Sequence, residues 1–544
     1  PDFVFLVIPL TRSVMGFPMR LSFSLFLAAL LLGPIGPVEP AVSAGPASDA
    51  PSTGESSAEE RPSEAQPSAD RPNILWLIAE DMGPELGSYG TEHVHTPHLD
   101  SLAVRGMRFT HVFTTSPVCS PSRSALNTGM YQFTIGAHNH RSHRPNDPSP
   151  YPHPLPDGVQ IVSDWLRHAG YYTGNVVDFP EGVSFDGNGK TDWNFSYDGA
   201  PFDTDVWSEL VDRRPFYGQV NFSLTHRGGQ WDRADEMIEE PVDPDGVDVP
   251  PYYPDHPVVR ESWAQYLNAV TALDGRVGEV LDELRDSGAA DSTIVVFMAD
   301  HGRAMPRGKQ WPYDSGLHVP FIVYVPSALE KPAGYRSGSV SDRMISGIDI
   351  PATTLALAGV PDPPKMQGEI FLGPNRDEPR RYVFGGRDRG DETVDRVRTV
   401  RSRRYRYIRN YFPGRPFFQV NRYKIANYPI IWAMHDLHRK GELTEAQSFY
   451  MQPERPQEEL YDVIEDPWEI DNLAGEASER QILRDMRRRL VEWVERIDDQ
   501  GRYPEDPDVY EHYEQQMIEN YSAEIDRLCE KWEMDGETMS VCAE

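Results

Sequence analysis

Two short apolar runs, far apart in the chain, constrain its fold more than any other feature. Residues 73–79 (NILWLIA) and residues 292–299 (STIVVFMA) are each about as long as one strand and carry no charge. Continuous apolar runs of this length predict strands that are buried on both faces of a sheet. A helical pattern of leucine and valine precedes the second run. Helices that alternate with buried strands predict an α/β fold, with a mostly parallel sheet sandwiched by helices.

Each apolar run ends on a pair of side chains that can bind a metal ion. The first run is followed by Glu80 and Asp81, and the second by Asp300 and His301. In open α/β sheets, ligands bind outside the carboxyl ends of the strands. If both strands are central in one sheet, the four side chains converge there, and we predict them as metal ligands. The alternative is that each acid caps the helix that follows its strand.

The N-terminal part of the chain predicts an exported protein. Residues 1–44 contain a basic residue, a short apolar run and a small-residue cleavage site (VSA), a pattern typical of a secretory signal peptide. The alternative is an anchor helix, but the mainly apolar run 21–32 is short for a membrane span. Residues 45–71 are rich in Pro, Ser, Ala and Glu, which predicts a disordered linker. We therefore expect a periplasmic or secreted protein, with no membrane span after the signal is removed.

The rest of the chain divides into three predicted segments. Residues 72–370 carry the buried strands and form the larger domain, and residues 371–510, dense in Arg and Tyr, form a smaller C-terminal α+β domain. Within the smaller domain we expect an antiparallel sheet and a helix over residues 475–498. Residues 511–544 form an acidic tail. The formal net charge of −33 should repel nucleic acid and anionic membranes, so a site for an anionic substrate must supply its own cations.

The chain has only three cysteines, and Cys119 is far from the other two. In an exported protein, Cys529 and Cys542 are one plausible disulfide pair. That pairing leaves Cys119, in the stretch VCSPSRSALNTG, without a partner. A buried structural thiol is the commonest fate of a free cysteine, and a nucleophile is the alternative.

The stretch CSPSRSALNTG, which begins at Cys119, resembles the C-x-P-S-R-x-x-x-x-T-G signature of the sulfatase family. The upstream segment TPHLDSLAVRGMRFTHVF and the later strand end Asp300-His301-Gly302 agree with that family in order and spacing. The resemblance covers about residues 72–370 and implies an alkaline-phosphatase-like fold and a sulfuric ester hydrolase. In that family a dedicated formylglycine-generating enzyme oxidises the cysteine to formylglycine.

The chemistry of the family accounts for these residue types. A hydrated aldehyde carries two hydroxyls on one carbon; one attacks sulfur and expels the alcohol, and the second drives release of sulfate. A divalent cation polarises the sulfate oxygens and lowers the pKa of the attacking hydroxyl. Hard oxygen ligands suit one Ca²⁺ ion. Arg123, one helical turn after Cys119, is expected to hold the nucleophile and a metal-binding Asp in place; the alternative is a surface arginine.

Two further catalytic residues follow from matching motif to motif. Lys309, in RGKQWPYDSGLHVP, resembles the lysine about nine residues after the metal-binding Asp of the family, and would grip a sulfate oxygen. His226, in PFYGQVNFSLTHRGG, resembles the histidine that follows a PFF-like strand, and would protonate the leaving alcohol. A lone histidine is more often structural, but the position of His226 after a predicted strand favours function.

Three departures from the family pattern bear on the site. Glu80 stands where most members have Asp, so its longer side chain can bind differently. His301 stands where many members have Asn, and the softer imidazole admits a divalent metal other than Ca²⁺. The usual G-K-W-H segment is missing. Lys190, in GNGKTDWNF, is the candidate for its catalytic lysine, and Asp192 stands in place of its histidine.

The Glu-Asp pair, the IGAHNHRS loop and the KTDWNF segment resemble a bacterial branch akin to heparan N-sulfatases. Such a branch acts on sulfated glycans, at O- or N-linked sulfate. His138 and His140 in that loop are candidates to replace the missing histidine, and a polar loop is the alternative. Arg387 and Arg389, in GGRDRGDE, are candidates to hold further sulfate or carboxylate groups of a sugar. A salt-bridged surface loop is the alternative for these two arginines.

Other functions remain open at this stage. A phosphate or phosphonate ester hydrolase of the same superfamily is the nearest, because sulfate and phosphoryl groups share a tetrahedral shape. A non-catalytic glycan-binding homologue is another, and it predicts an unmodified Cys119. A redox role for Cys119 is the weakest, because Cys529 and Cys542 are poor resolving partners.

Overall fold

The structure is a computed structural model that describes residues 71–141 and 149–543. The predicted signal peptide (1–44) and, except for Arg71, the predicted linker (45–71) lie outside the described residues. Within the described ranges, no helix is both long enough and apolar enough to cross a bilayer.

The centre of the molecule is one large sheet. Its eight strands are β1 (Asn73–Ala79), β2 (Met107–Phe113), β3 (Tyr172–Asp178), β4 (Thr204–Val206), β5 (Phe216–Phe222), β6 (Thr293–Ala299), β7 (Phe321–Tyr324) and β8 (Ser339–Ser346). Their order is β4-β3-β5-β1-β6-β7-β2-β8. Every pair is parallel except the two that β7 forms with β6 and β2. The mostly parallel sheet predicted from the apolar runs is confirmed.

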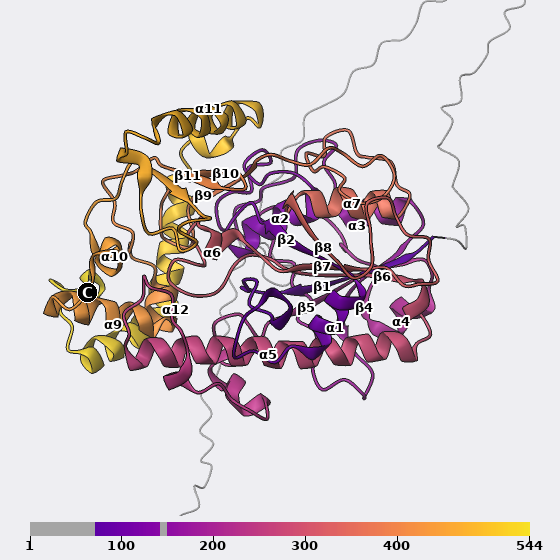
Figure 1. The fold of residues 1–544 in the computed structure, drawn as a ribbon, viewed down its shortest axis with the longest axis horizontal. Helices are drawn as coiled ribbons and strands as arrows, with labels where there is room; N and C mark the ends of the chain where they lie inside the picture. Colours follow the sequence, from indigo (N-terminus) through magenta and orange to yellow (C-terminus); the bar gives the residue numbers. More distant parts are fainter. Residues whose placement is uncertain (1–70, 142–148, 544) are drawn as a thin grey trace, which may run out of the picture. The chain divides into compact units, whose positions relative to one another are not determined.

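Helices cover both faces of this sheet. They are α1 (Pro97–Arg105), α2 (Cys119–Thr128), α3 (Val162–His168), α4 (Trp207–Asp212), α5 (Pro257–Asp286), α6 (Asp314–Leu317) and α7 (Asp349–Leu357). Figure 1 shows the long α5 along one face, and α2, α3 and α7 together on the other. The predicted sandwich is therefore confirmed.

Burial explains why the central strands read as continuous apolar runs. All seven residues of β1 are buried. Trp76 packs edge-on against Tyr217 of β5, and its Nε1 donates to Oγ1 of Thr354 in α7, 3.2 Å away. On the other face, Asp274 of α5 accepts the free N–H of Leu99 at 2.8 Å in the first turn of α1. Satisfying such a terminal N–H from a neighbouring helix fixes α1 against α5.

The C-terminal part contains a second, smaller sheet. Its strands are β9 (Val383–Arg387), β10 (Val397–Arg401), β11 (Tyr405–Asn410) and β12 (Glu458–Asp462). All its pairs are antiparallel, in the order β12-β11-β10-β9, which confirms the predicted antiparallel sheet. The helices of this part are α8 (Arg422–Asn427), α9 (Pro429–Lys440), α10 (Glu445–Ser448), α11 (Arg480–Arg496) and α12 (Pro507–Trp532). The helix predicted over residues 475–498 is α11, which is shorter at both ends.

Aromatic packing joins the small sheet to the rest of the molecule. Trp493 of α11 stacks on Phe384 of β9 with 5.0 Å between ring centres, and its edge meets Tyr131, 5.1 Å away, just after α2. At the other end, the predicted acidic tail contains most of α12, whose Cys529 forms a disulfide with Cys542. The predicted pairing of these cysteines is thus present, while the boundaries at residues 370 and 510 stay predictions.

Candidate active site

The two predicted ligand pairs meet at the carboxyl edge of the large sheet. Strands β1 and β6 are adjacent and central, and their last residues, Ala79 and Ala299, are paired. The segments Glu80-Asp81 and Asp300-His301 therefore leave the sheet side by side. The expectation that the two strand ends converge is confirmed.

Helix α2 carries Cys119 as its first residue, and all ten of its residues are buried. Ser124, Asn127 and Thr128 bond within the helix, as when Oγ1 of Thr128 donates to the carbonyl of Ser124 at 2.8 Å. The helix ends at Gly129, whose φ of 66° suits glycine and where a Cβ would lie 2.7 Å from the Met366 side chain. The Thr and Gly of the signature therefore have structural roles.

Four side chains form a buried cluster at this edge: Asp81, Cys119, Asp300 and His301. One ligand atom of each lies within 4.8 Å of the other three. The Sγ of Cys119 is 3.2 Å from Nε2 of His301 and 3.4 Å from Oδ1 of Asp81. Nε2 of His301 is 2.9 Å from the same Asp81 oxygen. Two carboxylates and an imidazole this close together fit a divalent cation.

The backbone of Asp81 is held in an uncommon conformation. Its φ is 51°, in the left-handed region that Asp tolerates better than most residues. Its N–H donates to Oδ1 of Asp300, 2.9 Å away, which ties the two strand ends together. Non-glycine residues held in this region concentrate at functional sites.

Arg123 connects α2 to the end of β6 and to β5. Its side chain is buried, and Nε donates to Oδ2 of Asp300 at 2.8 Å, while Nη1 donates to Oδ1 of Asn221 at 2.6 Å. Burial alone would lower the pKa of Arg123, but Asp300, Glu80 and Asp192 raise it above its ordinary value. Arg123 is thus a buried cation that fixes the Asp300 carboxylate.

Replacing Arg123 with methionine is expected to lower the free energy of unfolding by about 3–5 kcal/mol, because it leaves the Asp300 carboxylate buried without its partner. Urea denaturation in the presence of a chelator measures this. Arg285→Met is the matched control, because Arg285 pairs with Asp282 at the surface, and it should change the free energy by no more than about 0.5 kcal/mol. Equal effects of the two substitutions would contradict the role assigned to Arg123.

Lys309 and His226 lie together on the Asp81 side of the cluster. Nζ of Lys309 is 2.8 Å from Oδ2 of Asp81 and 3.2 Å from Nε2 of His226. Nδ1 of His226 lies 3.0 Å from the carbonyl of Arg227, so an N–H at Nδ1 donates there and Nε2 faces Lys309. Burial would lower the pKa of Lys309, but Asp81 and Cys119 raise it well above its ordinary value. Burial raises the pKa of Asp81, but Lys309, His226 and His301 outweigh burial and hold this pKa well below the usual range.

Glu80 lies beside the cluster of four rather than within it. Its Oε2 is 2.5 Å from Nζ of Lys190, and its Oε1 accepts a hydrogen bond from Nδ2 of Asn188. Nζ of Lys190 is also 3.6 Å from Asp192, whose carboxylate is buried and 3.9 Å from Arg123. The structure therefore brings Lys190 to the site. Asp192, which stands in place of the missing histidine, belongs to a buried network of acids and cations.

The charged residues around Cys119 favour the thiolate form of its side chain. Burial and Asp81 raise the pKa of its thiol, but Lys190, Lys309 and His301 outweigh them and lower it to about 6. Because Cys119 is also the first residue of α2, it lies at the positive end of a helix dipole, which favours the same state.

His138 and His140 have other surroundings. His138 is buried against Phe133, 6.4 Å between ring centres, and its Nδ1 has no hydrogen-bond partner among the described residues. Nδ1 of His140 is 2.8 Å from Oδ1 of Asp391. No contact within the described residues joins His138 to the cluster of four, so we assign it to packing.

The burial of His138 predicts a pH-dependent stability. Burial, with Arg398, lowers the pKa of His138 to about 3, so between about pH 3 and 6.5 the unfolded chain binds a proton that the folded chain does not. Its contribution to stability is complete above about pH 6.5 and is lost as the pH falls. In His138→Asn, the slope of unfolding free energy against pH should decrease by about 1.4 kcal/mol per pH unit near pH 5. Denaturation at several pH values measures this. A slope in His138→Asn that equals the slope of the parent would contradict the assignment.

Arg387 and Arg389, the two candidate sugar-binding arginines, differ in how far their side chains are paired with acids. Arg389 is held by Glu505, with Nε 2.5 Å from Oε2 and Nη2 3.1 Å from Oε1, so it is already neutralised. Arg387, the last residue of β9, is buried, and its Nη1 donates to the carbonyl of Gln310 at 2.7 Å. Both arginines are buried, so neither belongs to a salt-bridged surface loop.

The sequence gives no signal for several residues that complete the site. Asn188 and Asn221 bond to Glu80 and Arg123, and the ring centre of Tyr423 lies 5.4 Å from Nζ of Lys309. Asn188 could have been suspected from its place two residues before Lys190. Tyr423 and Asn221 lie in no motif, and only the fold brings them to the site.

A buried carboxylate-imidazole cluster with a cysteine at a helix start, at the edge of a sheet of this topology, is compatible with the metal site of a hydrolase. The family model "Sulfatase" matches residues 72–360, and the chain therefore belongs to the sulfatase family and is a sulfuric ester hydrolase. The model "N-sulphoglucosamine sulphohydrolase, C-terminal" matches residues 307–456. The resemblance to heparan N-sulfatases predicted from the sequence is confirmed.

Comparison with known proteins agrees with this family. The chain is 34% identical over 478 residues to an ulvan-active sulfatase of Formosa agariphila, which covers 80% of this chain and 77% of the relative. It is 28% identical over 460 residues to N-sulphoglucosamine sulphohydrolase of Homo sapiens, which covers 77% and 89%. The solved structure of a 2-O GAG sulfatase matches with a TM-score of 0.55 at 20% identity over 81% of this chain and 96% of that one, which shows a shared fold.

Proposed function

We propose that this protein removes sulfate, as an O-sulfate ester or an N-sulfate, from a sulfated glycan, with a formylglycine formed from Cys119 as its nucleophile. The names of the two relatives, one acting on ulvan and one on N-sulphoglucosamine, support a sulfated sugar as substrate. The observation that carries the mechanism is the position of Cys119 at the start of a buried helix, with its Sγ 3.4 Å from Asp81 and 3.2 Å from His301.

The lysines near Cys119 are suited to binding the sulfate group. Lys309 pairs with Asp81 and Lys190 pairs with Glu80, and both supply positive charge at the site in a chain of net charge −33. Charged donors of this kind bind oxyanions more strongly than neutral ones. Nε2 of His226 faces Lys309 and the cluster, so it is the nitrogen that delivers a proton to the leaving oxygen or nitrogen.

Asp81, Asp300 and His301 would hold a divalent cation, for which we propose Ca²⁺. When bound, the ion polarises the sulfate oxygens and lowers the pKa of a nearby hydroxyl. Arg123 keeps the Asp300 carboxylate oriented toward it. Glu80, predicted as a fourth ligand, is held by Lys190 and Asn188, and we assign it to positioning Lys190.

Maturation and export belong to the same proposal. A formylglycine-generating enzyme would oxidise Cys119, and the hydrated aldehyde supplies the hydroxyl that attacks sulfur. An exported, periplasmic or secreted location is supported by the pattern of residues 1–44 and by the size of a polymeric substrate.

The first test is the mass of the proteolytic peptide that contains Cys119, from protein produced together with a formylglycine-generating enzyme. A mass lowered by the thiol-to-aldehyde difference is expected. An intact thiol, from cells shown to mature another sulfatase, would overturn the mechanism and favour the glycan-binding homologue. Turnover of a sulfated sugar and of its phosphate counterpart, under the same conditions, distinguishes sulfate from phosphate or phosphonate hydrolysis. We expect the sulfate to react faster.

A further inference from the structure

A second group of cations surrounds a cavity next to the proposed active site. The cavity has a volume of about 210 Å³ and is lined by parts of β9, α8 and α9 and by residues 538–541 near the C-terminus. Among its lining residues are Arg387, Lys424 and the aromatic side chains of Trp311, Phe417 and Phe418, and none of the lining residues is acidic. In a chain with 85 acidic and 52 basic residues, a cavity with two cations and no acid calls for an explanation.

Arg387, which lines the cavity, has two guanidinium nitrogens without a hydrogen-bond partner in the described part of the chain. Only its Nη1 makes a hydrogen bond, to the carbonyl of Gln310. Its Nη2 is 3.5 Å from Asp395, but that carboxylate is bound by Arg455 through both of its oxygens. Nε and Nη2 of Arg387 have no hydrogen-bond partner among the described residues, although the residue is 4% exposed. Such a guanidinium retains a free donor edge for an oxyanion.

Lys424 is the second cation of the cavity, and it is also 4% exposed. Its Nζ lies 3.7 Å from the centre of the Trp311 ring, and no hydrogen bond or ion pair of this atom is present within the described residues. Burial, together with Arg387, lowers its pKa well below the usual range, while Asp391 and Glu392 raise it less. These two acids are engaged elsewhere: Asp391 accepts from Asn421, and Glu392 accepts from the N–H of Arg422.

Burial without an ion-pair partner destabilises the charged form of Lys424, and an anion that enters the cavity would stabilise that charged form. The cavity adjoins the proposed reaction centre along two segments. Gln310, which lines it, follows Lys309, and Lys424 follows Tyr423, whose ring centre is 5.4 Å from Nζ of Lys309. Its volume is below the about 300–1,000 Å³ of typical ligand pockets, so it admits one sugar-sized group or less.

We propose that Arg387 and Lys424 form an oxyanion site that receives a second anionic group of the glycan, a carboxylate or a sulfate other than the one removed. The assignment rests on the proposed function, because the first anionic group occupies Lys309 and Lys190. The aromatic side chains of Trp311, Phe417 and Phe418 supply apolar surface for the sugar ring that carries this group. Substrates with two anionic groups are therefore preferred to those with one.

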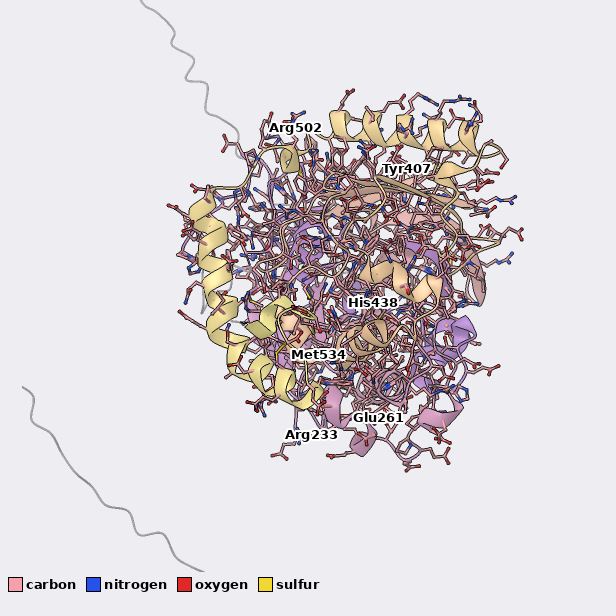
Figure 2. All side chains as sticks on the ribbon, turned by 90° about the vertical axis from the view of Figure 1, so that its left-hand side faces the viewer. Arg233, Glu261, Tyr407, His438, Arg502 and Met534 are labelled. Carbon is pink, nitrogen blue, oxygen red and sulfur yellow. A yellow bond between two sulfur atoms is a disulfide. The ribbon has the colours of Figure 1, made fainter. Side chains whose placement is uncertain are left out.

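The C-terminal segment forms one wall of this site. Residues 538–541 line the cavity, and the disulfide between Cys529 and Cys542 ties that segment to α12. Figure 2 views the molecule from this side, with Met534 and His438 marking the C-terminal segment and α9. Nη1 of Arg439 in α9 donates to the carbonyl of Glu533, 3.4 Å away, which joins the two elements.

Crystals of the full-length Cys119→Ala variant soaked in sodium selenate test the site directly, because selenium gives an anomalous signal and selenate mimics sulfate. We expect one peak at Lys309 and His226, which reports on the proposed function, and a separate peak within hydrogen-bond distance of Arg387 and Lys424. Absence of the second peak overturns the oxyanion site, whatever is found at the first. Lys424→Met should remove the second peak and keep the first.

Calorimetry on the same Cys119→Ala background distinguishes a group of the glycan from a free anion. Glucosamine-2-N,6-O-disulfate and an N-sulfated disaccharide that carries a uronate are compared with glucosamine N-sulfate. At least one of the two doubly charged sugars should bind about 10–100-fold more tightly than the singly charged one. Lys424→Met should abolish this gain and Lys424→Arg should restore much of it.

Lys440→Met is the matched control for these measurements, because Lys440 pairs with Asp436 on the surface of α9 and should keep the full gain. Selenate in the cavity without any gain for either doubly charged sugar would mean that the site holds a free anion, and would overturn its assignment to the glycan. The same gain in Lys424→Met as in the parent would overturn it as well.

Discussion

Replacing Cys119 with alanine is expected to lower kcat on a sulfated sugar by about 10⁴-fold or more, because a covalent enzyme without its nucleophile loses most of its rate enhancement. The residue is buried and close to Asp81 and His301, and alanine at the start of α2 removes only the sulfur. The fold and the binding of a divalent cation should be retained. Steady-state turnover, with circular dichroism and metal binding measured on the same sample, checks this expectation.

The double substitution Cys529→Ala and Cys542→Ala is the control for cysteine loss as such. It removes the disulfide near the C-terminus and leaves the cluster of four untouched. We expect a lower free energy of unfolding, by about 2–4 kcal/mol, and catalytic residues that remain in place. If Cys119→Ala kept more than a tenth of the wild-type kcat, Cys119 would not be the nucleophile.

Asp81→Asn should weaken divalent-cation binding by more than about 100-fold, which exceeds the 10–100-fold effect of altering groups that only support a ligand. Asparagine has nearly the same size and also tolerates the left-handed backbone at this position, where φ is 51°. The loss therefore comes from the carboxylate charge, which also pairs with Lys309 and His301. Equilibrium dialysis against Ca²⁺ gives the affinity, and kcat should fall in parallel.

Glu80→Gln is the matched substitution at the neighbouring residue. Its carboxylate binds Lys190 and Asn188, so the affinity for the cation should fall by no more than about 100-fold, while substrate binding weakens through Lys190. If Glu80→Gln lost the metal as completely as Asp81→Asn, Glu80 would be a direct ligand after all. Metal affinity that stays unchanged in Asp81→Asn would refute the cluster as a metal site.

The sequence predicted the centre of the site because its signals are local. The strands β1 and β6 are fully buried, so they appear as uninterrupted apolar runs, and the residues at their ends can be located within one position. The spacing between Cys119 and Arg123 is one helical turn, which the helix α2 then imposes. Pairing of the two strands places Asp81 and Asp300 together without further information.

What the sequence could not predict depends on contacts between distant segments. The sequence gives no sign that the charge of Arg389 is paired, but in the structure Glu505, 116 residues later, binds and neutralises it. His138 lies in a loop of polar residues and is nevertheless buried, next to Phe133 and near Arg398 and Asp499 from distant parts of the chain. Glu80 and Asp81 are neighbours with the same charge, yet they pair with lysines from different parts of the chain. Glu80 pairs with Lys190, and Asp81 pairs with Lys309.

The burial of α2 sets an order of events during synthesis. In the folded molecule Cys119 is 4% exposed and lies in the helix α2, so a modifying enzyme has little access to it. Asp300, which anchors α2 through Arg123, emerges 177 residues later. At about 5–20 residues per second, the helix then has no anchor for about 10–35 s. The oxidation proposed for Cys119 would then fall within that interval or within transport of the unfolded chain, so slower elongation should raise the fraction of active enzyme.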